Sequence, residues 1–292
     1  MNTIRVLVFG ATGTGKTSLC NVLTGQSRPT DNGAHGVTAK THRYSGFQAE
    51  GSRIEVVDTV GLHESNFGTV PAEKAIVQLV ELLENSKEGF NLLVHVTRAS
   101  RITEEHEEDY KFFVEKMTQG QIPVVLVVTG CENESPMQAW VERNQLPFER
   151  FAYKEIIPTC FASGGPMEAH FAPLRGESRS VVIKAIISTA LPASFKLYGE
   201  GTGNTFSQVL TRVWNEFVDL AGLPHKYRRK MSESAYGLMK RLGVPEAIAK
   251  AAVAHIPDLV EEMANKFPFP FAGKIAKSIA ETILGRFKKS DG

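Results

Sequence analysis

The sequence GATGTGKT, from Gly10 to Thr17, matches the pattern G-x-x-x-x-G-K-[ST] and decides the fold. It directly follows a short apolar run, Ile4 to Phe9, and opens a helix-forming stretch from Lys16 to Leu23. Glycines let such a loop curl so that successive backbone N–H groups point at phosphate oxygens, and the following helix presents its positive end to the same anion. This strand-to-helix placement predicts a phosphate-binding loop, and it disfavours the alternative of a glycine-rich turn with an incidental lysine.

Each residue of this loop has an expected contact. Lys16 is expected to bridge the β- and γ-phosphates, and the Thr17 hydroxyl is expected to ligate Mg²⁺. The candidate nucleotide contacts of the loop are Gly10, Ala11, Thr12, Gly13, Thr14, Gly15, Lys16, Thr17 and Ser18.

Two later segments are predicted to complete the Mg²⁺ and phosphate site. The run VVDTVGL places Asp58 at a strand end, where P-loop proteins hold Mg²⁺ with an acidic residue, and the Gly61 N–H can contact the γ-phosphate. Before it, NGAHGVTAKTH is a polar stretch in which Thr38 is the candidate Mg²⁺ and γ-phosphate contact. The alternatives are an isolated turn at D-x-x-G and a surface loop in which Thr38 only caps a turn.

The first 190 residues alternate β-branched runs with helical patterns, which is typical of a parallel sheet wrapped by helices. Continuous apolar runs such as VVLVV suit strands that are covered on both faces. The expected buried strands are Ile4 to Phe9, Arg53 to Val57, Leu92 to Val96, Val124 to Val128 and Glu155 to Cys160, with an edge strand at His42 to Gln48. The expected helices are Lys16 to Leu23, Pro71 to Leu83, Glu104 to Met117, Pro136 to Asn144 and Arg179 to Ile187. The fold class predicted is α/β, a doubly wound and mostly parallel sheet.

A second region is expected after Leu191, where PASFKLYGEGTGNTF gathers Pro and Gly and predicts a linker. We therefore predict a P-loop domain over residues 1–190 and an all-helical extension over residues 191–292. The helices expected in the extension are Phe206 to Ala221, Ser232 to Leu242, Pro245 to Ala264 and Lys274 to Phe287.

Composition bears on the binding partners and the cellular location of the protein. A net charge of +1 predicts no global attraction to nucleic acid, and three widely spaced cysteines suggest a reducing compartment. No apolar run reaches the ~20 residues of a membrane-spanning helix, so we predict a cytoplasmic protein. The last expected helix carries an apolar stripe, Ile275, Ile279, Ile283 and Phe287, opposite basic residues. That helix either contacts an anionic membrane surface or packs on its own domain.

In order, GATGTGKT, GVTAKT, VVDTVGL, VTRASRITEEHEEDY and VVLVVTGCEN resemble the successive motifs of the septin-like immunity-associated GTPases, or paraseptins, and their Toc import-receptor relatives. The resemblance runs from Ile4 to Cys160, and Arg101, Ile102 and Thr103 match the family's Arg-aromatic-Thr box with Ile102 in the aromatic position. It implies a Ras-like fold, Mg·GTP binding, slow hydrolysis, nucleotide-dependent homodimerisation and frequent membrane association.

Base recognition is where the sequence departs from this pattern. GTPases place N/T-K-x-D after the fifth strand, whereas this chain has TGCE: Thr129 matches, Gly130 replaces the lysine, and Glu132 replaces the aspartate. A glutamate can also accept the two guanine N–H donors, so guanine is the predicted base. The alternative is that Glu132 is a solvated loop acid. Ala162 and Ser163 stand where GTPases place a further base-contacting loop.

The catalytic machinery is predicted to be incomplete in one chain. Leu62 stands where Ras-like enzymes place a glutamine that orients the attacking water, and leucine cannot do so. His63 and Thr38 are the catalytic candidates, although His63 also fits a solvated loop residue. Arg98 and Arg101 are candidates for a positive group supplied by a second subunit.

The predicted function is a GTP-binding switch or scaffold with slow, dimerisation-assisted hydrolysis of GTP to GDP and phosphate. The alternatives are a P-loop ATPase or kinase, and a nucleotide-binding scaffold without significant hydrolysis.

Overall fold

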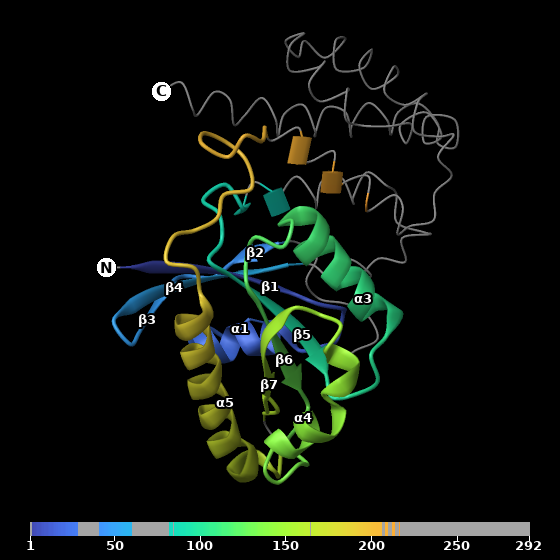
Figure 1. Cartoon of the computed structure of the whole chain (residues 1–292). Coiled ribbons are helices and arrows are strands. Elements are labelled where there is room, and N and C mark those ends of the chain that lie inside the picture. Colours follow the sequence, from blue (N-terminus) through green and yellow to red (C-terminus); the bar gives the residue numbers. More distant parts are fainter. Residues whose placement is uncertain are drawn as a thin grey trace, which may run out of the picture. The chain divides into compact units, whose positions relative to one another are not determined.

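The computed structural model describes residues 2–28, 41–59, 82–83, 85–163, 165–205, 208, 209, 212, 213 and 216. Within them, one sheet has the strand order β2-β4-β1-β5-β6-β7, with β3 also paired to β4 (Figure 1). The strands are β1 Thr3–Phe9, β2 His42–Arg43, β3 Phe47–Ala49, β4 Ser52–Asp58, β5 Leu92–Arg98, β6 Val124–Thr129 and β7 Tyr153–Pro158. β2 and β3 run antiparallel to β4, and all other neighbours are parallel. The predicted α/β class with a mostly parallel sheet is confirmed.

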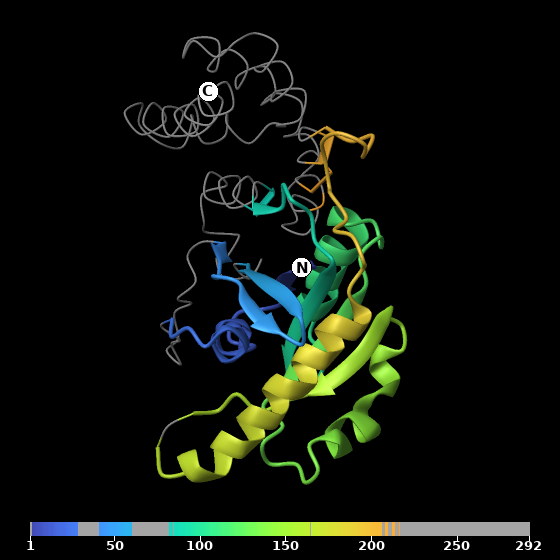
Figure 2. The same ribbon diagram turned by 90° about the vertical axis from the view of Figure 1, so that its left-hand side faces the viewer.

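The central strands form as expected from their apolar runs, because both faces of the sheet are covered. Every residue of β6 is buried, as are the last four residues of β1. One face packs on α1 (Lys16–Thr24) and α5 (Glu168–Thr189) in a single apolar cluster. The other face packs on α3 (Glu104–Tyr110), its π-helical continuation Lys111–Met117, and α4 (Gln138–Asn144), as Figures 1 and 2 show.

Helix α5 is longer than its sequence indicates. It has 22 residues and begins at Glu168, whereas the expected helix spans only Arg179 to Ile187. Pro173 and Gly176, both unfavourable inside a helix, hide its first half. Both residues lie on the exposed side of that first half, so they disturb no core packing.

The expected edge strand at His42 to Gln48 is broken into β2 and β3. Tyr44 still donates its backbone N–H to Val56, at 2.9 Å, but its side chain turns into the core. Gly46 lies so close to Arg53 that an added Cβ would be 2.8 Å from the guanidinium Nη2. Residues 44–46 thus separate the two short strands. The expected strand Glu155 to Cys160 is shifted by two residues, to Tyr153–Pro158, because the polar residues Tyr153 and Lys154 also belong to it.

By its internal contacts, the chain divides into one unit of residues 1–65 and 81–202 and a second unit of residues 66–80 and 203–292. The predicted boundary at residue 191 stays a prediction. In the second unit, Gln208, Val209, Arg212, Val213 and Glu216 are helical, and the helices expected from Ser232 onward lie outside the described residues. The helix expected at Pro71 to Leu83 also falls mostly outside them. Among the described residues, none of the helices is both long and apolar enough to cross a membrane.

Residues 191–198, expected to be a linker, are hydrogen bonded to the rest of the first unit; we call them the return segment. Phe195 exchanges backbone hydrogen bonds with Phe90, at 2.8 and 3.1 Å. Asn91 donates its side-chain amide to Leu191 O, at 2.8 Å. At Gly89 an added Cβ would lie 2.4 Å from the Phe195 carbonyl oxygen, so this contact requires a glycine. Backbone pairing of this kind holds the return segment against the end of the sheet.

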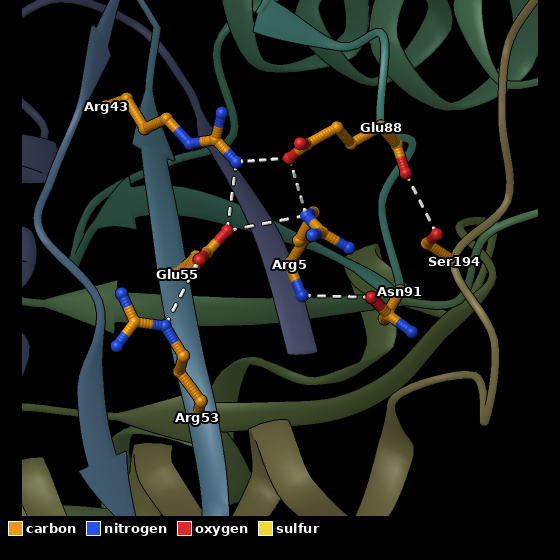
Figure 3. A network of polar contacts seen from close by, with 7 residues as sticks. All are labelled: Arg5, Arg43, Arg53, Glu55, Glu88, Asn91 and Ser194. Carbon is orange, nitrogen blue, oxygen red and sulfur yellow. Dashed lines mark hydrogen bonds and ion pairs between the residues drawn. The ribbon is translucent and has the colours of Figure 1, made fainter. Parts of the chain in front are cut away.

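A network of charged residues borders the same region (Figure 3). Glu88 pairs with Arg43 and, at 3.0 Å, with Arg5, and the hydrogen bond from Arg43 is the main reason that the pKa of Glu88 is lowered. Glu55 contacts Arg43 at 2.9 Å and Arg53 at 3.3 Å. These side chains are partly exposed, so each pair adds little stability. Figure 3 shows that the network is continuous with Asn91 and Ser194, and it therefore links β1, β2 and β4 to the return segment.

Candidate functional site

The glycine-rich loop lies between β1 and α1, where the strand order reverses. β1 has β4 on one side and β5 on the other, so the loop opens at the carboxyl end of the sheet. This is where open α/β sheets bind ligands. Gly10 begins the loop with φ of 144°, and an added Cβ would lie 2.2 Å from the Val96 carbonyl oxygen. No other residue fits at this position without moving the backbone of β5.

The loop delivers the start of α1 with its backbone donors uncapped. Gly15, at φ of 96°, is the N-terminal cap, and no described side chain caps the helix there. The first N–H groups of a helix have no intrahelical partner. Together with the helix dipole they form an anion site, so the geometry matches the predicted phosphate cradle.

Lys16 lies within this loop and is only 4% exposed. Its Nζ donates to the carbonyl oxygens of Gly10, at 2.7 Å, and Ala11, at 2.9 Å. These two bonds hold the ammonium group against the loop backbone. A buried cation beside uncapped N–H groups is suited to a multiply charged anion.

Asp58 and Thr17 meet at the same end of the sheet. The Thr17 hydroxyl donates to Asp58 Oδ2 at 3.1 Å, and the carboxyl group is 1% exposed. Its Oδ1 is buried and accepts no hydrogen bond from the described residues. Burial raises the pKa of Asp58 to about 6, and the Lys16 charge and the Thr17 hydrogen bond act in the opposite direction. An all-oxygen pair with one unused carboxylate oxygen fits Mg²⁺, which Thr17 and Asp58 would hold.

Thr129 lies beneath the phosphate loop. Its hydroxyl is 2.7 Å from the Thr14 carbonyl oxygen and 3.2 Å from that of Thr97. Gly15 leaves no free space there, because an added Cβ would lie 3.2 Å from Thr129 Cγ2. The sequence indicates a base contact for Thr129; the structure places its hydroxyl on the loop, where it fastens the loop to β5 and β6.

The TGCE segment continues from the end of β6. Gly130 adopts φ of 82°, and Cys131 donates its N–H to Thr159 at 3.1 Å, which ties the segment to the end of β7. Glu132 is half-buried, and its Oε2 is buried without a hydrogen-bond partner in the described part of the chain. A buried, unused acceptor matches the proposed recognition of N–H donors better than it matches a solvated acid. Ala162 is held nearby by Arg175, which donates to its carbonyl oxygen at 2.7 Å.

Four sequence candidates lie outside the described residues: Thr38, Gly61, Leu62 and His63. Their roles stay predictions. Among the described residues, the structure thus brings the phosphate loop, Asp58 and Thr129 together.

Sequence reasoning missed a buried polar cluster behind the loop. The Tyr153 hydroxyl is 2.7 Å from His95 Nδ1 and 2.9 Å from His106 Nε2, and the two imidazoles stack at 4.2 Å. Burial lowers the pKa of both histidines, that of His106 to about 4. His95 Nε2 is buried and has no hydrogen-bond partner among the described residues. The three residues come from distant parts of the sequence, so no local pattern could have found the cluster.

A mostly parallel sheet with this glycine-rich loop at the strand reversal, and with a buried carboxylate beside the loop threonine, defines a P-loop nucleotide-binding domain. Residues 4–142, the stretch that builds most of the sheet and the site, match the model of the AIG1 family. This match confirms the predicted resemblance to the immunity-associated GTPases.

Several solved structures resemble part of the chain at low identity. SelB, a translation elongation factor from Methanococcus maripaludis in complex with the GTP analogue GPPNHP, is 20% identical over 65% of this chain and 35% of its own, with a TM-score of 0.42. Era in complex with MgGDPNP and nucleotides of 16S ribosomal RNA is 18% identical over 74% and 66%, with a TM-score of 0.48. Toc33 from Arabidopsis thaliana in complex with GDP and Mg²⁺ is 18% identical over 65% and 87%, with a TM-score of 0.40. The chain thus spans about a third of SelB and about two thirds of Era. No curated protein sequence matches it.

Proposed function

We propose that this chain binds Mg·GTP and hydrolyses it slowly to GDP and phosphate, as a nucleotide-dependent switch or scaffold. The observation that carries the proposal is the phosphate loop. There, buried Lys16 and the uncapped start of α1 lie beside the pair formed by Thr17 and Asp58. The match of residues 4–142 to the AIG1 family model supports a GTP-binding domain.

Each group has a defined task in this chemistry. The loop N–H groups and Lys16 would bind and orient the β- and γ-phosphates and neutralise charge that develops as the terminal phosphoryl group leaves. Thr17 and Asp58 would hold Mg²⁺, which supplies further neutralisation of the phosphate oxygens when bound. Glu132 would accept the N–H donors of guanine, because its buried Oε2 has no described partner.

Slow turnover and assistance by a second copy are the finer part of the proposal. They rest on Leu62, which cannot orient an attacking water, and on the family resemblance around Arg101. An arginine supplied by a partner raises phosphoryl-transfer rates by several orders of magnitude in other GTPases. A homodimer that forms with bound GTP is therefore the proposed active form. The competing candidate, a scaffold without significant hydrolysis, rests on the same leucine.

Nucleotide competition tests the first part of the proposal. GTP should displace a fluorescent guanine nucleotide from the purified protein in the presence of Mg²⁺, and equimolar ATP should not. Displacement by ATP alone would favour the ATPase or kinase alternative. Lys16→Ala serves as the control, because a signal that survives this change does not come from the phosphate loop.

Single-turnover hydrolysis tests the second part. We expect a rate below ~0.01 s⁻¹ in dilute protein, comparable to that of unassisted small GTPases, with a rise per molecule as concentration increases. A fast rate independent of concentration would contradict assistance by a dimer. A rate indistinguishable from that of Lys16→Ala at every concentration would instead identify a scaffold.

We also propose a cytoplasmic location with peripheral membrane contact through the stripe from Ile275 to Phe287. Flotation with anionic liposomes, compared between the full chain and a version that ends near Asn265, tests this contact. Equal flotation of the two versions would reject it.

A further inference from the structure

We propose that Arg98 covers one face of the nucleotide base in this chain, in place of the lysine that Gly130 removes from the TGCE segment. The inference rests on the proposed function and deepens it, because it names a residue that contributes to base affinity. Arg98 then acts within its own subunit, and not as the positive group for a second one.

The geometry at Gly130 motivates the assignment. A Cβ added to Gly130 would lie 3.4 Å from Arg98 Cγ and 3.6 Å from Arg98 Nε. The Arg98 side chain therefore runs past the point from which a side chain at position 130 would leave the backbone. Gly130 also has φ of 82°, a conformation that a lysine rarely adopts. Arg98, from the neighbouring strand β5, thus places a cationic side chain in the space that a lysine at position 130 would occupy.

The backbone fixes Arg98 relative to the rest of the site. Arg98 is the last residue of β5 and pairs in register with Thr129, the last residue of β6. Ala99 continues the pairing, since its N–H donates to the Thr129 carbonyl oxygen at 2.7 Å. The hydroxyl of Thr129 in turn contacts Thr14 in the phosphate loop. Arg98 thus begins on the same rigid edge that positions the phosphates.

The Arg98 side chain is exposed, and its guanidinium has no hydrogen bond or ion pair to the described residues. Other arginines of the first unit are engaged with carboxylates: Arg143 with Glu134, and Arg150 with Glu107. A planar guanidinium is weakly hydrated and stacks well on aromatic faces. Arg98 is therefore free to lie on a planar ring system.

Glu132 and Arg98 would contact different parts of the base. Its buried Oε2, two residues beyond Gly130, can accept N–H donors from the edge of a base, whereas Arg98 would pack on the face. Edge hydrogen bonds distinguish guanine from adenine, but face packing accepts any purine. Loss of Arg98 should therefore weaken binding of the base as a whole and leave the preference between purines to Glu132.

The test compares Mg·GDP with Mg·ribose 5-diphosphate, which has the same phosphates and sugar but no base. Both compete against a ribose-labelled fluorescent GDP on the full chain, for wild type, Arg98→Ala and Arg98→Lys. We expect Arg98→Ala to weaken GDP binding about fivefold and to leave ribose 5-diphosphate unchanged, as for a cation on an exposed ring. Arg98→Lys should retain part of the effect. Arg150→Ala, at the other end of the strands, is the matched control and should bind GDP like wild type.

Three results would overturn the inference. One is unchanged GDP affinity in Arg98→Ala, and another is an equal loss for both ligands, which would place Arg98 on the phosphates or sugar. The third is a lowered melting temperature of nucleotide-free Arg98→Ala that accounts for the loss. If the wild-type protein binds no GDP, the proposed function is wrong. If it binds GDP and Arg98→Ala binds GDP equally well, only this inference is wrong.

Discussion

The phosphate end and the base end of the proposed site use different kinds of chemical group. At the phosphate end, the proposed contacts are backbone N–H groups and buried residues, and Gly10 admits no side chain at all. At the base end, the proposed contacts are two side chains, those of Glu132 and Arg98, and Gly130 stands where the usual motif has a lysine. A single substitution can replace one side chain, but it leaves the backbone N–H groups in place unless it distorts the loop. We therefore expect severe effects of substitution at the phosphate end and graded ones at the base end.

The largest effect should follow from Lys16→Ala. This change removes a buried, charge-assisted contact to phosphate and should weaken Mg·nucleotide affinity by about 3 kcal/mol or more, which is over a hundredfold. The fold should persist, because among the described residues the Lys16 ammonium group donates hydrogen bonds to the loop carbonyls of Gly10 and Ala11 and to no side chain. Calorimetric titration with GDP and a thermal melt measure the two quantities. Wild-type affinity in a folded Lys16→Ala protein would contradict the site.

Asp58→Asn separates stability from binding. Because the pKa of Asp58 is raised from 3.8 to about 6, the ionised carboxylate costs the nucleotide-free fold on the order of 2–3 kcal/mol above pH 6. Stability from this group is present below pH 3.8 and is lost as the pH rises to about 6. Asparagine keeps the size and an acceptor for Thr17 but carries no charge.

The difference in unfolding free energy, Asp58→Asn minus wild type, should therefore grow between pH 4 and pH 6 and stay constant above that range. Denaturant unfolding without nucleotide or Mg²⁺ measures it. The subtraction cancels the opposite contributions of His95 and His106. At the same time, the dependence of nucleotide affinity on Mg²⁺ should weaken. A difference that does not change with pH would show that the Asp58 carboxyl is not perturbed.

Glu132→Gln tests the base end. Hydrogen bonds to a charged group contribute about 1.5–3 kcal/mol, so the change should weaken GDP binding about tenfold or more. Affinity for ribose 5-diphosphate should not change. Glu132→Asp, which restores the usual residue of the motif, serves as the matched comparison and should keep guanine preference. If Glu132→Gln binds GDP as wild type does, Glu132 is a loop acid without a role in recognition.

The smallest effect is expected at the link between the two ends. Thr129→Val removes the hydroxyl that contacts Thr14 and Thr97 but keeps the shape, so stability should fall by about 1 kcal/mol. Because the phosphate loop loses its fastening to β6, the dissociation rate of GDP should rise more than the association rate falls. Stopped-flow exchange kinetics would show it, and an unchanged dissociation rate would mean that the loop holds its shape unaided.

The features that the sequence predicts correctly are those encoded by contiguous residues. The phosphate loop was predictable because its residues are contiguous and the pattern requires a strand before it and a helix after it. The buried strands were predictable because apolar runs such as Val124 to Val128 suit only a sheet covered on both faces. Asp58 followed from its place at a strand end, and the structure puts it beside Thr17.

What escaped prediction depends on contacts between distant residues or on local signals that tertiary packing overrides. Nothing in the sequence places Arg98 over Gly130, because the contact arises from the register of β5 on β6. Pro173 made the first half of α5 look non-helical, although its exposed side tolerates the missing donor. Proline and glycine likewise made the return segment look like a linker, while Phe90 and Phe195 pair their backbones.

The return segment has a consequence for the order of events during synthesis. Asn91 is almost fully buried and shares its side chain between Arg5, which is made first, and Leu191, which is 100 residues further along the chain. At about 5–20 residues per second, the ribosome needs roughly 5–20 s to deliver that second partner. Until then the edge formed by Phe90 and Asn91 stays open while the rest of the sheet can already pair. During that interval the polar groups of Phe90 and Asn91 lack the partners that Phe195 and Leu191 give them in the folded chain.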